Sequence, residues 1–156
     1  SATLAEIAVL AARFVREMHI EPRVALLSFS NFGSAPHPAS EKVARAVEQI
    51  RELDPELEVD GEMQADFALN QALIQEYYPF STLTGPANIL VFPNLGAANT
   101  AYKLMDWLGD VDVIGPVLLG MHRPVHVLQR GSRVQDVVNL VTIASVDAAE
   151  RSRVEG

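Results

Sequence analysis

The residues best suited to chemistry in this chain are gathered in a turn near residue 130. Along residues 125–138, an apolar and β-prone run ends in a polar turn that carries Arg130 and Arg133, and an almost wholly apolar segment follows. This pattern predicts a strand, a tight Arg-Gly turn and the start of a helix. Ser132, with Gln135 three residues later, fits a capping box at the N-terminus of that helix.

The turn is a candidate anion site. Backbone N–H groups at a helix start, with Arg130 and Arg133 beside them, favour an anionic group such as a phosphate. Asp136 follows one turn into the helix, where its carboxylate either complements the helix dipole or acts as a base on whatever the arginines hold. A capped helix with two solvated arginines is the structural alternative, and this stretch alone does not decide between them.

Composition limits the other classes of function. The chain has 156 residues, of which 49% are hydrophobic, and this suits one domain with a substantial core. The absence of cysteine excludes a disulfide, a thiol nucleophile and a zinc–thiolate site. The net charge of −8, with lysine only at Lys42 and Lys103, argues against a nucleic-acid surface and a polybasic membrane patch.

The apolar runs and the N-terminus bear on localisation. No apolar run approaches the ~18 residues of a membrane span, and the N-terminus has no signal-peptide pattern. We therefore expect a cytoplasmic protein without a membrane partner. Because the chain starts without methionine and enters a helical pattern at once, we also expect it to be a piece of something longer.

Hydrophobic periodicity predicts helices and strands in alternation. Helical spacing of apolar residues indicates helices over about residues 3–18, 43–53, 67–69, 96–108 and 133–150. Shorter apolar runs indicate strands over about residues 24–29, 57–60, 88–92, 113–120 and 125–128. The helix at 96–108 is expected to bury Ala97, Ala101, Leu104, Met105 and Leu108. Such alternation is typical of an α/β domain with a mostly parallel sheet.

In parallel sheets, ligands bind beyond the C-terminal ends of the strands. Three polar turns, at residues 30–34, 93–96 and 129–132, follow predicted strands. We therefore expect these three turns to lie at a common location. The helix at 133–150 is apolar on nearly every side, so it is either central to this domain or covered by another domain or subunit.

The other groups of polar residues are weaker candidates for a functional site than the turn at Arg130. The four histidines have no metal-ligand spacing and are interpreted as packing or solvated residues. Asp60, Glu62 and Asp66 form a local acidic group that could bind a divalent cation, although a solvated strand end and helix start explains them as well. No serine stands in a G-x-S-x-G elbow, and no glycine pattern matches a dinucleotide or P-loop motif.

Several motifs resemble the phosphotransacetylase family. They are residues 23–34 (RVALLSFSNFGS), 60–66 (DGEMQAD), 88–95 (NILVFPNL), 99–104 (NTAYKL), 114–116 (IGP) and Arg130-Gly131 with Asp136. Five segments are similar in sequence to one branch of this family, the C-terminal domain of large bacterial NADP-dependent malic enzymes. They are residues 30–34 (SNFGS), 78–81 (YPFS), 85–88 (GPAN), 119–121 (LGM) and 124–131 (PVHVLQRG).

The resemblance implies a three-layer, isocitrate or isopropylmalate dehydrogenase-like α/β fold. Phosphotransacetylases move acetyl between coenzyme A and phosphate in a cleft between two lobes. Residues 1–156 would be the second lobe with its closing helix, which packs back toward an absent first lobe. In the family, the arginine at the position of Arg130 stabilises the transition state, and the aspartate at the position of Asp136 deprotonates the thiol. Gln129 replaces a serine that the active enzymes carry before the arginine.

In the malic enzyme branch, the resemblance implies a non-catalytic domain that binds acetyl-CoA as an allosteric inhibitor and helps to build an oligomer, with dimers formed through this domain. The malate, NADP and metal sites would lie in the absent N-terminal malic-enzyme part. The implied coenzyme-binding residues are Ser30, Asn31, Gly33, Ser34, Asn94, Gln129, Arg130, Gly131 and Ser132. Two alternatives stay open: a catalytic phosphate acetyltransferase, and a module that serves assembly alone.

Overall fold

A parallel three-stranded sheet lies at the centre of the N-terminal part of the chain. The computed structural model describes residues 1–154. Its strands, β1 (Arg23–Leu27), β2 (Glu58–Met63) and β3 (Ile89–Val91), are arranged in the order β2-β1-β3. The predicted parallel α/β architecture is therefore confirmed, with β1 in the centre and β2 and β3 at the two edges.

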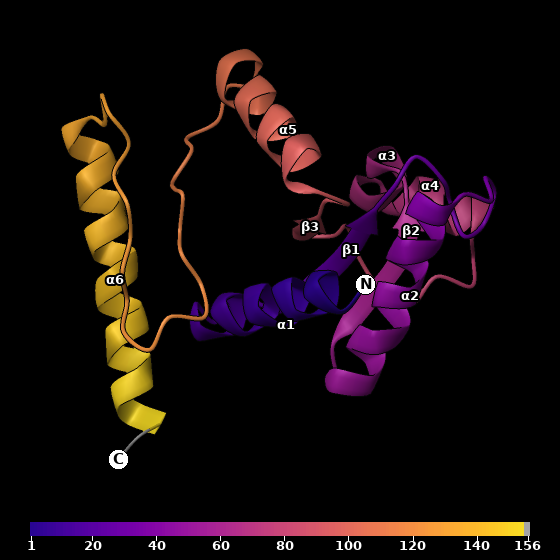
Figure 1. The fold of residues 1–156 in the computed structure, drawn as a ribbon, viewed down its shortest axis with the longest axis horizontal. Helices are drawn as coiled ribbons and strands as arrows, with labels where there is room; N and C mark the ends of the chain where they lie inside the picture. Colours follow the sequence, from indigo (N-terminus) through magenta and orange to yellow (C-terminus); the bar gives the residue numbers. More distant parts are fainter. Residues whose placement is uncertain (155–156) are drawn as a thin grey trace.

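Two helices cover one face of the sheet (Figure 1). Helix α1 (Ala2–Glu17) and helix α2 (Pro38–Leu53) pack their apolar sides against the strands. The side chains of Val24, Leu26, Val59, Ile89 and Val91 point into this layer and are almost fully buried. At about 25 cal/mol per Å² of buried apolar surface, this layer supplies much of the stability of the domain.

A second, smaller core lies on the other face of the sheet. Helix α3 (Ala65–Leu69) contributes Ala68, and helix α4 (Gln71–Tyr77) contributes Ile74, to a cluster with Leu27 and Met63. Helix α4 was not predicted, because Ile74 is the only buried residue of its seven and the segment has no apolar residues at helical spacing that would indicate a helix. The two cores make residues 1–94, which we call the core unit, a helix–sheet–helix sandwich.

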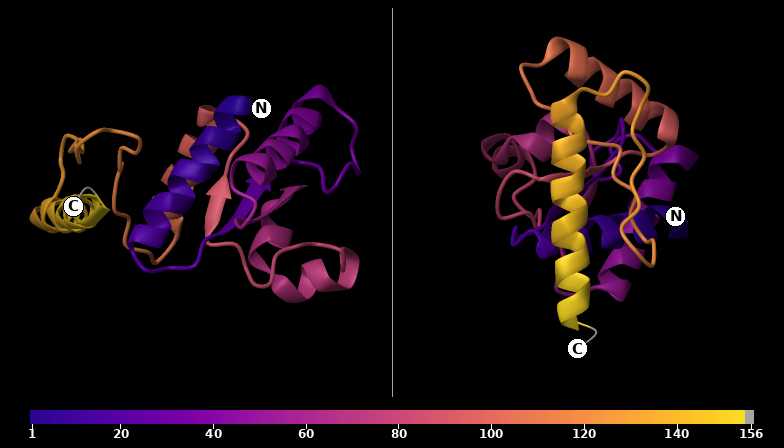
Figure 2. Two further views of the ribbon diagram at one scale, coloured as in Figure 1. Left: turned by 90° about the horizontal axis from the view of Figure 1, so that it is seen from below. Right: turned by 90° about the vertical axis from the view of Figure 1, so that its left-hand side faces the viewer.

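Residues 95–154, which we call the arm, extend away from the core unit (Figures 1 and 2). Helix α5 (Leu95–Leu108) forms as predicted, but the expectation that it buries an apolar stripe is wrong. Leu104 and Met105 are about half exposed, and Leu108 is 82% exposed. The helix follows β3 out of the sheet, and no other element of the described structure covers its apolar side.

The segment between α5 and α6 corrects a second prediction. Residues 113–120 and 125–128 were expected to be strands, but neither forms one in the part of the chain that the structure describes. A strand needs a neighbour to accept its backbone hydrogen bonds, and these segments run beside no free strand edge. Their alternating apolar side chains, such as Ile114, Val125 and Val127, are correspondingly exposed.

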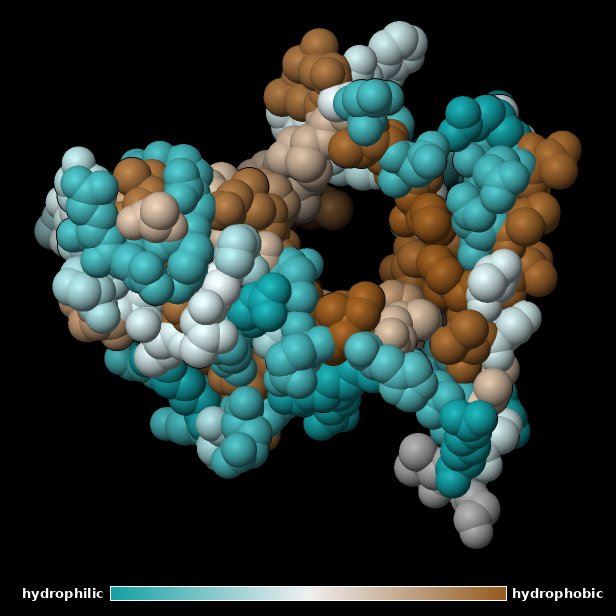
Figure 3. All heavy atoms as spheres, turned by 180° about the vertical axis from the view of Figure 1, so that it is seen from behind, coloured by the Kyte–Doolittle hydropathy of each residue, from teal (hydrophilic) through white to brown (hydrophobic). Residues whose placement is uncertain are grey.

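Helix α6 (Val134–Val154) forms the last element of the arm. Leu140 and Asp147 are the buried residues among those arm side chains that the structure describes, and Val134, Val138 and Val141 are at least half exposed. Figure 3 shows apolar side chains over much of this helix. The first alternative, a helix central to this domain, is therefore wrong for the described chain.

A small contact, which we call the joint, connects α6 to the core unit at the end of α1 through Glu17, Asp147 and Arg151. Asp147 is buried and pairs with Arg151, whose guanidinium also donates to the backbone carbonyl of Met121 at 2.6 Å. Glu17 of α1 lies against this pair, and burial, followed by the charge of Asp147, raises the pKa of its carboxyl.

No helix among the described residues is both long enough and apolar enough to cross a membrane.

Candidate functional site

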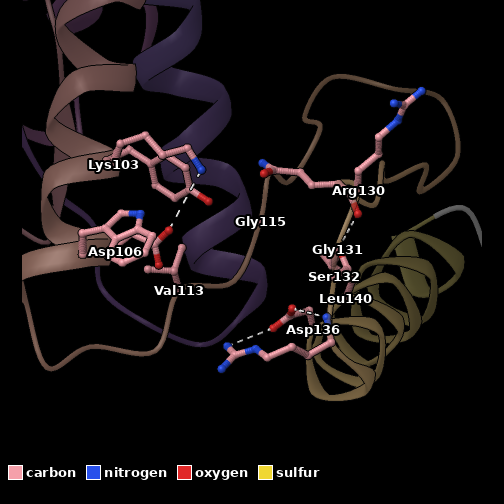
Figure 4. A pocket seen from close by; sticks show the side chains of 13 residues that line it. Lys103, Asp106, Val113, Gly115, Arg130, Gly131, Ser132, Asp136 and Leu140 are labelled. Carbon is pink, nitrogen blue, oxygen red and sulfur yellow. Dashed lines mark hydrogen bonds and ion pairs between the residues drawn. The ribbon is translucent and has the colours of Figure 1, made fainter.

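A polar cavity of about 360 Å³ lies between α5 and the turn that precedes α6. Its walls are formed by Tyr102, Lys103, Asp106, Trp107, Val113, Gly115, Gln129, Arg130, Gly131, Ser132, Arg133, Asp136 and Leu140. Figure 4 shows the two walls facing each other across the cavity, with Lys103 and Asp106 on α5 and Arg130 to Asp136 on the opposite side. The Arg-Gly turn identified from the sequence therefore lines a concave site.

Arg130 is exposed and has no hydrogen-bond or ion-pair partner among the described residues. Figure 4 shows its side chain extending away from Asp136 rather than pairing with it. Gly131 has a φ of +86°, which a residue with a side chain adopts only under strain, and this conformation makes the tight turn between Arg130 and the helix. The turn thus lines the cavity, and the Arg130 guanidinium, which extends away from α5 in Figure 4, has no partner among the described residues.

The start of α6 is capped one residue later than the sequence indicated. The backbone N–H of Arg133 donates to Oδ2 of Asp136 at 2.6 Å, which is the reciprocal half of a capping box. Ser132 instead donates its hydroxyl to the carbonyl of Gln129 at 2.8 Å, and Gln135 contacts Asn139. The predicted Ser132/Gln135 box is therefore wrong, because the N–H and the hydroxyl of Ser132 both donate to the carbonyl of Gln129, while Asp136 caps the N–H of Arg133.

The same contacts set the charge of Asp136. The hydrogen bond from the backbone N–H of Arg133, and after it the contact with the Arg133 guanidinium at 3.3 Å, lower the pKa of this carboxyl below its usual value. A carboxylate held in this way accepts a proton less readily than a free one. In this conformation Asp136 is a structural cap and a weak base.

The wall formed by α5 was missed by sequence reasoning. Lys103 lies 4.0 Å from the carboxylate of Asp106, and its Nζ stands 4.3 Å above the ring of Tyr102. The cavity-lining residues of α5 share one side of the helix at i, i+1, i+4 and i+5 spacing: Tyr102, Lys103, Asp106 and Trp107. This spacing was the signal in the sequence that could have indicated a polar side of the helix. Only the fold places this side opposite the Arg130 turn.

The loop at residues 30–34 does not line the cavity. Ser30 is fully buried and donates to the carboxylate of Glu62 at 2.8 Å, and the N–H of Gly33 donates to the same carboxylate at 2.7 Å. Ser34 accepts from the N–H of Asn31 at 2.9 Å, so the loop is tied to itself and to β2. Within the core unit, these hydrogen bonds fix the positions of the four loop residues that the resemblance implies as coenzyme ligands.

Asn94 is the N-cap of α5 and accepts from the N–H of Ala97 at 2.9 Å, and it too lies outside the cavity walls. Of the three turns expected at one location, the cavity contains only the turn at 129–132. That turn follows no strand in the described structure, so the rule that gathers strand ends does not apply to it.

The acidic group weighed as a cation site has internal partners. Asp60 is buried and accepts from Arg51, from the hydroxyl of Ser81 and from the N–H of Thr82. Neither Asp60 nor Glu62 is solvated, which corrects that interpretation. Among residues 1–154, no three or more acidic or histidine side chains are grouped so that they could hold a metal ion.

Comparison with known proteins identifies the family. Residues 1–145 match the family model described as phosphate acetyl/butaryl transferase, and the chain belongs to this family. It is 50% identical over 146 residues to an NADP-dependent malic enzyme of Escherichia coli (strain K12), covering 93% of this chain and 19% of that protein. It is 45% identical over 148 residues to a phosphate acetyltransferase of Bacillus subtilis (strain 168), covering 95% of this chain and 46% of that protein.

Solved structures agree with the sequence relatives. The chain resembles the EutD phosphotransacetylase from Staphylococcus aureus with a TM-score of 0.86, at 41% identity over 93% of this chain and 45% of that one. It resembles a phosphotransacetylase from Streptococcus pyogenes with a TM-score of 0.88, at 41% identity over 94% and 45%. The resemblance inferred from motifs is confirmed, and this chain spans less than half the length of these relatives.

Proposed function

We propose that this chain is the acetyl-CoA-binding regulatory lobe of an NADP-dependent malic enzyme. The observation that carries the proposal is the Arg130-Gly131 turn, which lines a polar cavity and whose guanidinium has no partner among residues 1–154. The thioester ligand carries phosphates, and a guanidinium beside a tight turn is suited to bind them. The 50% identity to the malic enzyme of Escherichia coli supports the choice of parent.

Regulation rather than catalysis is supported by the state of Asp136. A base that removes the proton from a thiol works best when its pKa is near the working pH. Here the Arg133 N–H and guanidinium lower the pKa of Asp136, which moves it away from that range. Gln129, which lines the cavity, stands where the resemblance implies serine in active transferases.

The exposed arm supports a larger assembly. In the proposed parent, a preceding lobe of an isocitrate dehydrogenase-like fold would cover the apolar sides of α5 and α6 and pair with the extended segments at 113–120 and 125–128. Oxidation of malate, with NADP and a divalent metal ion, would occur in the N-terminal malic-enzyme part. This lobe would also contribute to the contacts of a homodimer, in the cytoplasm.

The test is the response of the full-length enzyme to acetyl-CoA. Arg130→Ala should raise the acetyl-CoA concentration needed for inhibition at least tenfold, since a charge-assisted contact is worth about 1.5–3 kcal/mol. Malate oxidation without inhibitor should be unchanged. Arg123→Ala is the matched control, because Arg123 is exposed in the same arm but lies outside the cavity. Unchanged inhibition in Arg130→Ala would contradict the proposal.

The second candidate is a catalytic phosphate acetyltransferase. It is favoured by the phosphate acetyltransferase of Bacillus subtilis, of which this chain covers 46%, and by the presence of Asp136 in the cavity. Formation of acetyl-CoA from acetyl phosphate by the full-length protein, abolished in Asp136→Asn, would establish it. If the full-length protein binds no acyl-CoA by calorimetry but still dimerises, a purely structural role in assembly is left.

A further inference from the structure

The joint borders a second cavity, of about 220 Å³, which shares no wall residue with the candidate site. Figure 1 shows the C-terminal end of α1 beside the segment that leads from α5 to α6, and the cavity lies between them. Its charged wall residues are Arg13 and Glu17 of α1 and Arg151 of α6. The segment at 119–121 forms another wall and has no ionisable side chain. The contact of α6 with α1 therefore leaves a gap that is lined by charged groups from both helices.

The joint has more carboxylates than cations that pair with them. Asp147 is only 1% exposed and forms its ion pair with the guanidinium of Arg151. Glu150 pairs with Arg153 at 2.6 Å. Glu17 forms no hydrogen bond or ion pair with a residue that the structure describes. The carboxylate of Glu17 therefore stands near that of Asp147 without a cation of its own.

The charges that face Glu17 come from the two helices. On α1, Arg13 lies one turn before Glu17 and lines the same cavity, but it pairs with no described residue. On α6, Asp147 and Glu150 repel the ionised Glu17, and Arg151 attracts it. Burial raises the pKa of Glu17 above the ordinary value of 4.5, Asp147 adds to this rise, Arg151 opposes it, and Glu150 adds to it again. The neutral carboxyl therefore fits the closed joint better than the carboxylate does.

We propose that Glu17 makes the joint respond to pH, so that a proton gained by its carboxyl draws α6 against α1 and a proton lost loosens this contact. When Glu17 is neutral, its repulsion with Asp147 and Glu150 is gone, and Arg151 serves Asp147 alone. Helix α6 carries one wall of the candidate site, whereas α5 on the other wall follows β3 directly. The joint thus fixes one wall against the core unit, whatever the site binds.

The direction of the effect follows from linkage between protonation and closure. A carboxyl whose pKa is higher in the closed joint than in the open one holds its proton more tightly when the joint is closed. The stabilisation of the joint is therefore complete below the ordinary value of 4.5 and is lost as the pH rises through the raised pKa. Added salt should reduce the effect, because charges that are partly exposed to water are screened.

The experiment is hydrogen exchange of the full-length protein from about pH 5 to about pH 8, corrected for the pH dependence of chemical exchange. In the wild type, protection of amides in the last turns of α6 should fall by about 1.5- to 5-fold as the pH rises, the size expected for a partly exposed charge interaction. Glu17→Gln has almost the same shape but cannot ionise, so it should keep the low-pH protection throughout. Glu6→Gln, on the exposed side of α1, is the matched control and should behave as the wild type does.

A second variant tests the source of the repulsion. Asp147→Asn removes the charge that opposes Glu17 most strongly, so the change in protection with pH should become smaller, whatever the protection at the lowest pH. An unchanged pH dependence in Glu17→Gln or in Asp147→Asn would overturn the proposal, because another group would then be titrating. Loss of protection at every pH in Glu17→Gln would also overturn it, since Glu17 would then be a structural partner of α6 rather than a source of repulsion.

Discussion

The core unit and the arm follow the same helical patterns in sequence but differ in what those patterns produce. In the core unit, the apolar side of α1 is buried against the sheet, and Ala5, Ala8 and Ala12 are fully inaccessible. In the arm, α5 has an equally regular stripe and buries nothing. Periodicity therefore identifies the side of a helix that is suited to burial, and only a facing surface buries it.

The extended segments show the same contrast. Residues 23–27 and 58–63 become strands because each has a neighbour with matching hydrogen-bond register. Residues 113–120 and 125–128 have similar apolar character but no neighbour in the described structure. The cavity is formed between elements of this less packed region, and ligand sites are often found where local stability is low.

The largest expected effect tests the difference in packing directly. Leu26→Ala in the central strand should destabilise the chain by about 2–5 kcal/mol, because Leu26 is fully buried and its loss leaves a cavity. Leu108→Ala in the arm removes the same atoms from a side chain that is 82% exposed and should cost less than about 0.5 kcal/mol. Urea unfolding followed by circular dichroism measures both. Similar losses would mean that the arm is packed as well as the core unit.

A polar substitution tests whether the loop at 30–34 is structural. Glu62→Ala removes the acceptor for the Ser30 hydroxyl and the Gly33 N–H and should cost about 1–3 kcal/mol, since two groups in a buried setting lose their partner. Glu52→Ala, on the exposed side of α2, should have almost no effect in the same unfolding experiment. A neutral result for Glu62 would indicate that the loop does not depend on this carboxylate.

The joint between the two regions should respond locally. Asp147→Ala removes one of the partners of Arg151 and should weaken the contact of α6 with α1 by about 1 kcal/mol, a modest value because Arg151 is partly solvated. Hydrogen exchange should become faster in α6 and stay unchanged in β1. The exposed Asp110→Ala is the control within the arm. Faster exchange throughout the core unit would contradict a local joint.

The smallest effect concerns pH at the start of α6. Because the pKa of Asp136 is lower in the folded chain than in the unfolded one, its carboxylate stabilises the helix start above the ordinary aspartate value of about 3.9. This contribution is lost as the pH falls through the folded pKa. Carboxyl-detected NMR titration of Arg133→Ala should find the pKa raised only partly, since the backbone N–H is retained and is the larger cause. A full return to the ordinary value would assign the effect to the guanidinium instead.

The amino-acid sequence by itself determined the alternation of helices and strands in the core unit, the family, and the Arg-Gly turn that lines the cavity. These features depend on local periodicity, turn residues and motifs, which act over a few residues. The predictions from sequence that were wrong concern which groups pair with each other through hydrogen bonds. The capping box was assigned to Ser132 because serine is a good cap, whereas Ser132 donates to the carbonyl of Gln129 and Asp136 caps the N–H of Arg133.

Only the tertiary structure decided which turns share a cavity and which segments become strands. The loop at 30–34 is held by Glu62 of β2, and α5 and the Arg130 turn line one cavity, although in each case the segments lie far apart in the chain. Such contacts depend on surfaces that face each other in space. No local pattern in the sequence encodes which surface will be there.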